Sequence, residues 1–151
     1  MPDNPTTYDF GAGPVLAHRL ENGAWIADSA TVDPTATIGE YARIGAHVRI
    51  SRGASIGEYA SIGPAAIIGP GALIGADAHV GPDAIIDERA NIGRDAQIGR
   101  GAHIRPGAII GERVTIFEFA TVADDAIIVD TQLVSIDEVG ASAPASKGLR
   151  L

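Results

Sequence analysis

The stretch IGRDAQIGRGAHIRPGAIIG, residues 92–111, places an isoleucine at every sixth position. The same step, followed in both directions, meets only Ile or Val at all eighteen positions from Ile26 to Ile128. Ala or Val stands four residues after each of them, except after Ile128, where Gln132 follows. A period of six fits neither an α-helix of 3.6 residues per turn nor the plain alternation of a strand. It indicates a solenoid in which a short strand and a corner repeat.

The hexad also predicts which side chains face the interior. Ala102 and Ile104 are two residues apart, so in an extended segment both point the same way, and we expect that direction to be inward. The residue between them, His103, then points outward. Glycine follows the aliphatic residue in ten of the eighteen hexads, and proline follows that position in five. These positions are predicted to form the corners, with glycine supplying a positive φ.

The general pattern of the hexad is an aliphatic residue, glycine, two variable residues, a small residue and one more. This pattern resembles that of the hexapeptide-repeat superfamily, as in bacterial acyltransferases and gamma-class carbonic anhydrases. The resemblance covers residues 26–133. It implies an all-β fold, a left-handed parallel β-helix shaped as a three-faced prism of about six coils of eighteen residues. We expect residues 1–19 to form an N-terminal arm or cap, 20–133 the β-helix and 134–151 a C-terminal cap and tail. Phe10 and Trp25 are predicted to plug the first coil.

Composition excludes several classes of partner. The formal net charge is −8, whereas nucleic-acid binding relies on clustered Lys and Arg. The sequence contains no run of eighteen apolar residues and no basic, apolar leader at its start. We therefore expect a cytoplasmic protein with neither a nucleic-acid nor a membrane partner.

The outward positions predict how copies of the chain associate. Sorted at a spacing of eighteen, they give one polar face and two faces that carry apolar residues. Such residues on neighbouring faces of a prism indicate a contact between subunits. We expect a homotrimer, the usual assembly of the superfamily, formed through Ile67, Leu73, Ile85, Ile109 and Ile127.

His103 is the strongest candidate for a catalytic residue. The segment AHIRPGAII, which begins at Ala102, resembles one found near the active site of sugar N-acetyltransferases in the superfamily. In those relatives an Asn-His-Asp stretch about one coil earlier supplies the general base, whereas this chain has IIDERA with Asp87 and Glu88. His103 could replace that base, with Glu88 or Asp87 of a neighbouring subunit orienting its ring.

Three functions remain open on the sequence. The eighteen hexads contain no inserted residue, which favours a rigid homotrimeric structural or binding module over an enzyme. Such a module would have small-ligand clefts between its subunits and no cofactor. The alternative is a CoA-dependent acyltransferase that uses acetyl-CoA and His103. A gamma-class carbonic anhydrase comes third, because His47 and His103 lie three coils apart and cannot share a zinc ion, so no metal site is predicted.

Overall fold

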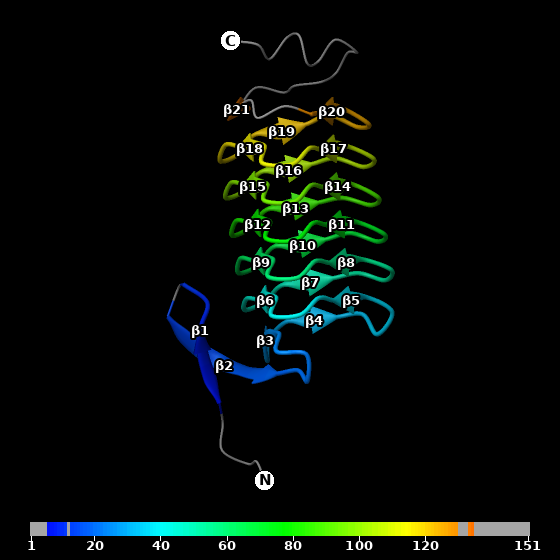
Figure 1. The fold of residues 1–151 in the computed structure, drawn as a ribbon. Helices are drawn as coiled ribbons and strands as arrows, with labels where there is room; N and C mark the ends of the chain where they lie inside the picture. The colour runs from blue at the N-terminus through cyan, green and yellow to red at the C-terminus, as the bar shows by residue number, and fades with distance from the viewer. Residues whose placement is uncertain (1–5, 12, 130–132, 135–151) are drawn as a thin grey trace.

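The chain forms a three-sided solenoid in which each side is a sheet of very short strands (Figure 1). The computed structural model describes residues 6–11, 13–129 and 133–134. Each strand of the prism pairs in parallel with the strand eighteen residues later, as Ile85 does with His103. The predicted fold class, a left-handed parallel β-helix with coils of eighteen residues, is confirmed. The described residues include no helix that is long and apolar enough to span a membrane.

Three sheets, here called sheets 1, 2 and 3, follow one another around each coil. Sheet 1 has nine strands: β1 (Thr7–Asp9), β2 (Pro14–Arg19), β3 (Trp25–Ala27), β6 (Arg43–Ile44), β9 (Ser61–Ile62), β12 (His79–Val80), β15 (Gln97–Ile98), β18 (Thr115–Ile116) and β21 (Leu133–Val134). Sheet 2 has six: β4 (Thr31–Val32), β7 (Arg49–Ile50), β10 (Ile67–Ile68), β13 (Ile85–Ile86), β16 (His103–Ile104) and β19 (Thr121–Val122). Sheet 3 has six: β5 (Thr37–Ile38), β8 (Ser55–Ile56), β11 (Leu73–Ile74), β14 (Asn91–Ile92), β17 (Ile109–Ile110) and β20 (Ile127–Ile128).

The core is a stack of isoleucines and alanines along the axis of the prism. The inward orientation predicted for Ala102 and Ile104 is confirmed, since both are fully buried. No polar or charged side chain is buried among the described residues. The largest side chains that are almost fully buried belong to ten isoleucines and two valines: Ile44, Ile56, Ile62, Ile68, Ile86, Ile92, Ile104, Ile110, Ile116, Ile128, Val48 and Val114.

The positive φ of the corners lies at a different position from the one that the sequence suggested. Positive φ was expected at the glycine that follows each aliphatic residue, but it occurs two residues later, at every sixth residue from Tyr41 to Asp125. The glycine position is instead a place of close approach between coils. A Cβ added to Gly75 would lie 2.7 Å from the backbone nitrogen of Arg94, in the next coil. Glycine is used there because it lets adjacent coils stack closely.

The N-terminal arm extends sheet 1 rather than plugging the prism. β1 and β2 form an antiparallel hairpin, and β2 pairs with β3 in the first coil. Trp25 was predicted to fill the end of the core, but it occupies an outward position in register with Arg43 and stacks on Tyr8. Phe10 also contacts Tyr8, at a ring-centroid distance of 4.7 Å. The predicted C-terminal cap and tail, 134–151, lies outside the described residues except for the end of β21.

The close approach at Gly75 leads to a stability prediction. Gly75→Ala should lower the free energy of unfolding by about 1 kcal/mol or more, because the new methyl group must push two coils apart. Gly53→Asp is the matched control: Gly53 has a φ of +70°, its Cβ would meet nothing closer than 3.8 Å, and Asp77 adopts the same conformation. Thermal unfolding followed by circular dichroism measures both. A Gly75→Ala variant as stable as the wild type would contradict the close approach at this position.

Candidate functional site

The outward side chains form three columns with different chemical character. On sheet 1, Ser61, His79 and Gln97 are in register, and the column is polar. On sheet 2, Ile67, Ile85 and His103 are consecutive. Sheet 3 carries Leu73, Asn91, Ile109 and Ile127 in the same way.

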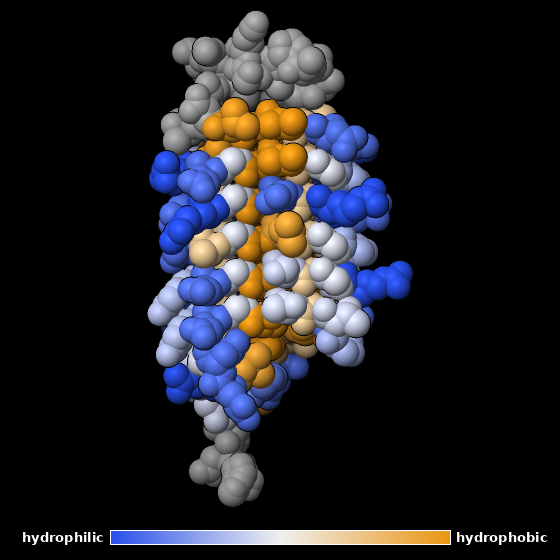
Figure 2. All heavy atoms as spheres, turned by 45° about the vertical axis from the view of Figure 1, so that its right-hand side comes forward, coloured by the Kyte–Doolittle hydropathy of each residue, from blue (hydrophilic) through white to orange (hydrophobic). Residues whose placement is uncertain are grey.

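Both apolar columns lie largely open in the single chain. Ile127 keeps 50% of its surface exposed, and Ile67, Leu73 and Ile109 are also exposed. Figure 2 brings the side with sheet 3 forward and shows hydrophobic side chains gathered along the middle of this face, most densely toward its C-terminal end. The histidine predicted as a general base therefore sits directly beside an exposed isoleucine column.

The corner between sheets 2 and 3 departs from the glycine rule. Side chains occupy the close-approach position in five of its six coils: Asp33, Ser51, Asp87, Arg105 and Ala123. The hydrogen bonds between coils are retained there: the backbone nitrogens of Asp87 and Arg105 lie 2.9 and 3.0 Å from their carbonyl acceptors in the next coil. This corner is thus the one edge of the described prism where residues other than glycine repeatedly occupy the close-approach position.

Asp87 and His103 form the closest pairing of candidate catalytic side chains in the described structure. Asp87 Oδ2 lies 2.6 Å from His103 Nε2, and about a third of each side chain is exposed. Strand register explains the contact, because His103 pairs with Ile85 and Asp87 is two residues beyond Ile85. We expected a carboxylate of a neighbouring subunit to orient the ring, and the structure supplies one from the same chain.

A small cavity of about 320 Å³ lies on the side of Asp87. It is lined by Gly69, Pro70, Asp87, Glu88 and Pro106. Glu88, the second candidate site residue, therefore lies in the cavity wall, whereas Asp87 makes the contact with His103. Two consecutive acidic residues therefore line one cavity, and one of them, Asp87, contacts the imidazole of His103.

Arg105, one coil beyond Asp87, forms a separate ion pair and is not part of the wall of this cavity. Its Nε donates to Asp124 Oδ1 at 2.5 Å. This hydrogen bond, with the charge of Asp124, raises the pKa of Arg105 above its ordinary value. The guanidinium is therefore paired with Asp124, and its charge also interacts with Asp87 in the cavity wall.

The other histidines form no comparable site. His18 contacts Asp28 at 3.0 Å on the N-terminal arm, with both side chains more than half exposed. His79 lies on the polar sheet 1, and the backbone nitrogen of His47 bonds to Ser29 at a corner. Within the described part of one chain, no three His, Asp or Glu side chains group closely enough to hold a metal ion.

The repeat itself matches a known family model. The model described as bacterial transferase hexapeptide (six repeats) matches residues 89–124, a segment that includes His103 and Arg105. The chain is a hexapeptide-repeat protein. No curated protein sequence matches this hexapeptide-repeat chain.

Several solved structures resemble the hexapeptide-repeat chain. PerB from Caulobacter crescentus, in complex with CoA and GDP-perosamine, is 30% identical with a TM-score of 0.69, over 73% of this chain and 52% of PerB. The acetyltransferase domain of PglB from Neisseria gonorrhoeae, in complex with acetyl coenzyme A, is 26% identical with a TM-score of 0.58, over 73% and 53%. WeeI from Acinetobacter baumannii shares the fold at 21% identity and a TM-score of 0.65, over 71% and 55%.

These relatives are longer than the hexapeptide-repeat chain. The chain spans about half the length of these three solved relatives. Of the functions that the sequence left open, the comparisons favour the acyltransferase over the structural module. The favoured interpretation of the sequence, a rigid module without enzymatic activity, therefore has less support than its alternative.

Proposed function

We propose that the protein is a CoA-dependent N-acyltransferase that moves an acetyl or similar small acyl group from a thioester to an amine. The observation that carries this proposal is the contact of 2.6 Å between Asp87 and His103. The likeness to acetyltransferases crystallised with CoA and acetyl coenzyme A supports the donor. Homotrimeric assembly, discussed below, is part of the proposal.

His103 is proposed to be the general base. An ionised Asp87 accepts a hydrogen bond from Nε2–H of His103, which fixes the proton on that nitrogen. The lone pair then lies on Nδ1, the nitrogen that does not contact Asp87. Nδ1 can take a proton from the amine nitrogen as it attacks the thioester carbonyl carbon, and the imidazolium can give that proton to the CoA sulfur as the C–S bond breaks. Asp87 stabilises the imidazolium that forms, as a carboxylate does for a catalytic histidine in other acyl-transfer enzymes.

The charge of the cavity favours an amine as the acceptor. Asp87 and Glu88 line it, and no cationic side chain is part of its wall. Two carboxylates attract an ammonium group and repel phosphate. An amine that arrives protonated must lose a proton before it can attack, and Asp87 in the cavity wall contacts His103, the proposed base. An amine-bearing sugar is the acceptor class that we propose.

Acetyl-CoA would supply the acyl group as an activated thioester. Its phosphates do not suit the acidic cavity, but its uncharged pantetheine arm suits the apolar columns on both sides of the corner. Ile85 on sheet 2 and Ile109 on sheet 3 offer such surfaces in the chain. A single prism has no opposite wall to enclose that arm, so the site requires a second copy of the chain.

A homotrimer provides that second wall. Sheets 2 and 3 meet at the corner that carries Asp87, and both bear exposed aliphatic residues. Full burial of one such side chain contributes about 1.5–3 kcal/mol. We propose that this corner points toward a threefold axis and that Ile67, Leu73, Ile85, Ile109 and Ile127 form the contacts.

Disrupting one of these isoleucines tests the assembly. Ile85→Lys would place an ammonium group in the contact, where an unpaired buried charge is costly, so the trimer should weaken or dissociate. Gln97→Lys is the matched control, since Gln97 holds the same repeat position on the polar sheet 1. Light scattering measures the mass of each. A monomeric wild type, or an Ile85→Lys variant as trimeric as its parent, would contradict the proposed interface.

Removing the imidazole tests the chemistry. His103→Ala should lower acetyl transfer from acetyl-CoA to an amino sugar by roughly 100-fold, with the fold intact. Asp87→Asn should also lower the rate, because the amide no longer stabilises the imidazolium. His79→Ala, which removes a histidine from the same repeat position on sheet 1, should leave the rate unchanged. The chain contains no cysteine, so a thiol reagent detects only the CoA that is released.

Two results would overturn this function. Turnover that survives in His103→Ala would remove the histidine from the mechanism. A wild-type trimer that shows no acetyl-CoA binding by calorimetry would contradict acyl transfer itself and restore the interpretation as a rigid structural module.

A further inference from the structure

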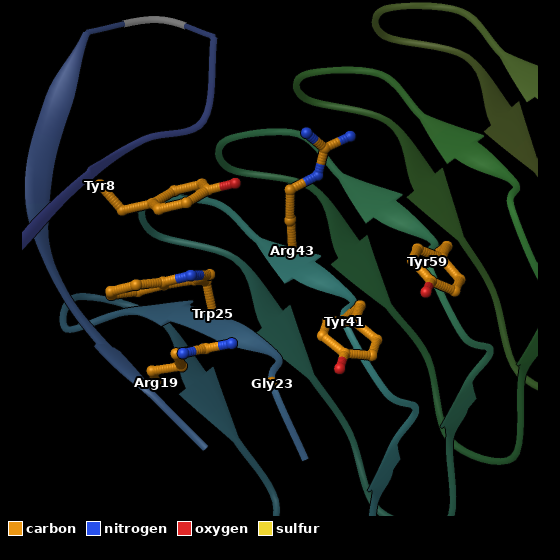
Figure 3. Close-up of a pocket in the computed structure, with 7 residues that line it drawn as sticks. All are labelled: Tyr8, Arg19, Gly23, Trp25, Tyr41, Arg43 and Tyr59. Carbon is orange, nitrogen blue, oxygen red and sulfur yellow. The ribbon is translucent and has the colours of Figure 1, made fainter. Parts of the chain in front are cut away.

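A second candidate site lies at the N-terminal end of the prism, on the outer side of sheet 1. Six side chains with aromatic or cationic groups line a cavity of about 390 Å³ (Figure 3): Tyr8, Arg19, Trp25, Tyr41, Arg43 and Tyr59. They come from the β1–β2 hairpin, from β3 and β6, and from two corners between sheets 3 and 1. The volume is within the range of small-molecule sites, about 300–1,000 Å³.

The aromatic rings are already arranged as two stacked pairs. Tyr8 and Trp25 are 4.7 Å apart between ring centroids with 23° between their planes. Tyr41 and Tyr59 are 5.2 Å apart with 16° between their planes. Tyr41 lies against Gly23, where any Cβ would come within 2.6 Å of its ring.

Tyr41 is packed against the backbone, and the rings of its pair with Tyr59 are still accessible. Gly23 is buried beneath the Tyr41 ring, whereas Tyr41 and Tyr59 are exposed, Tyr59 by 53%. Figure 3 shows the Tyr8–Trp25 pair on one side of the cavity and the two other tyrosines on the opposite side. A flat ring can therefore enter without a rearrangement of the backbone.

The charge of this cavity is opposite to that of the protein. The chain has a net charge of −8, yet the wall contains two arginines and no carboxylate. Among the described residues, neither Arg19 nor Arg43 forms an ion pair with a carboxylate. Unpaired guanidinium groups beside aromatic faces suit an anion joined to a planar ring, because guanidinium binds phosphate in a bidentate manner and bases stack on aromatic side chains.

We propose that this cavity binds a nucleotide, with the base against the Trp25 and Tyr41 rings and the phosphates on Arg19 and Arg43. A nucleic-acid strand is not the ligand, because two arginines on an acidic protein cannot neutralise a polyphosphate backbone. The site is separate from the acyl-transfer site. Arg43 and His103 are 60 residues apart, which corresponds to roughly 16 Å along the axis at about 4.8 Å per coil, and they lie on different faces.

The protein carries its own reporter for this site, since Trp25 is its only tryptophan. Titration of the full chain with GDP or UDP, with excitation at the red edge of tryptophan absorption, should quench the fluorescence in a saturable way. Arg43→Gln should weaken the binding roughly ten-fold or more, since it removes a charge-assisted hydrogen bond. Tyr41→Leu should weaken it through the loss of stacking. Arg49→Gln is the matched control, because Arg49 holds the same repeat position on sheet 2.

A series of ligands separates the contribution of the base to binding from that of the phosphates, and some of its results would contradict the proposal. Guanosine and uridine should bind more weakly than GDP and UDP. Pyrophosphate should also bind more weakly than GDP, because it lacks the base. The proposal is wrong if no nucleotide quenches saturably, if Arg43→Gln and Arg49→Gln behave alike in folded protein, or if pyrophosphate binds as tightly as GDP. Acetyl-CoA is absent from the titration, so the result does not depend on whether acyl transfer occurs.

Discussion

The close stacking of one coil on the next is the constraint on which the rest of the structure depends. Backbone N–H groups of one coil bond to carbonyl oxygens of the next, as Ile85 N does to Ala102 O at 2.9 Å. The same spacing brings isoleucine onto isoleucine inside the prism, with alanine leaving room beside it, so hydrogen bonding and core packing require the same distance. A residue that is too large inside, or a Cβ at Gly75, disturbs both at once.

This constraint also determines where chemistry can be placed. The inward positions must be aliphatic, and most close-approach positions must be glycine, which leaves the outward strand positions and the corners free to vary. His103 uses an outward strand position, and Asp87 uses a corner position where glycine is absent. Because the register is rigid, two residues sixteen apart in the sequence are held 2.6 Å apart without any inserted loop. The regularity that suggested a purely structural module is the feature that positions the proposed base.

The sequence predicted the repeat, the inward Ile and Ala columns and the three outward columns, because a period of six applied without interruption leaves few alternatives for the backbone. It did not predict that Asp87 of the same chain would contact His103. That contact depends on a side-chain rotamer at a corner, although the spacing of sixteen was a usable signal. The use of glycine was misassigned, since local sequence shows which residue is small but not which neighbouring backbone approaches it. Trp25 was misplaced for a similar reason: its apolar character suggested the core, whereas its repeat position was outward and its partner, Tyr8, lies in the arm.

The central claim is that His103, oriented by Asp87, serves an acyl-transfer site formed between copies of the chain. A crystal structure of the full chain with acetyl-CoA tests it most directly. The account predicts three copies around a threefold axis, the pantetheine arm between the apolar columns of two of them, and the thioester beside Nδ1 of His103. Acetyl-CoA bound away from His103, or a packing in which sheets 2 and 3 face solvent, would contradict it.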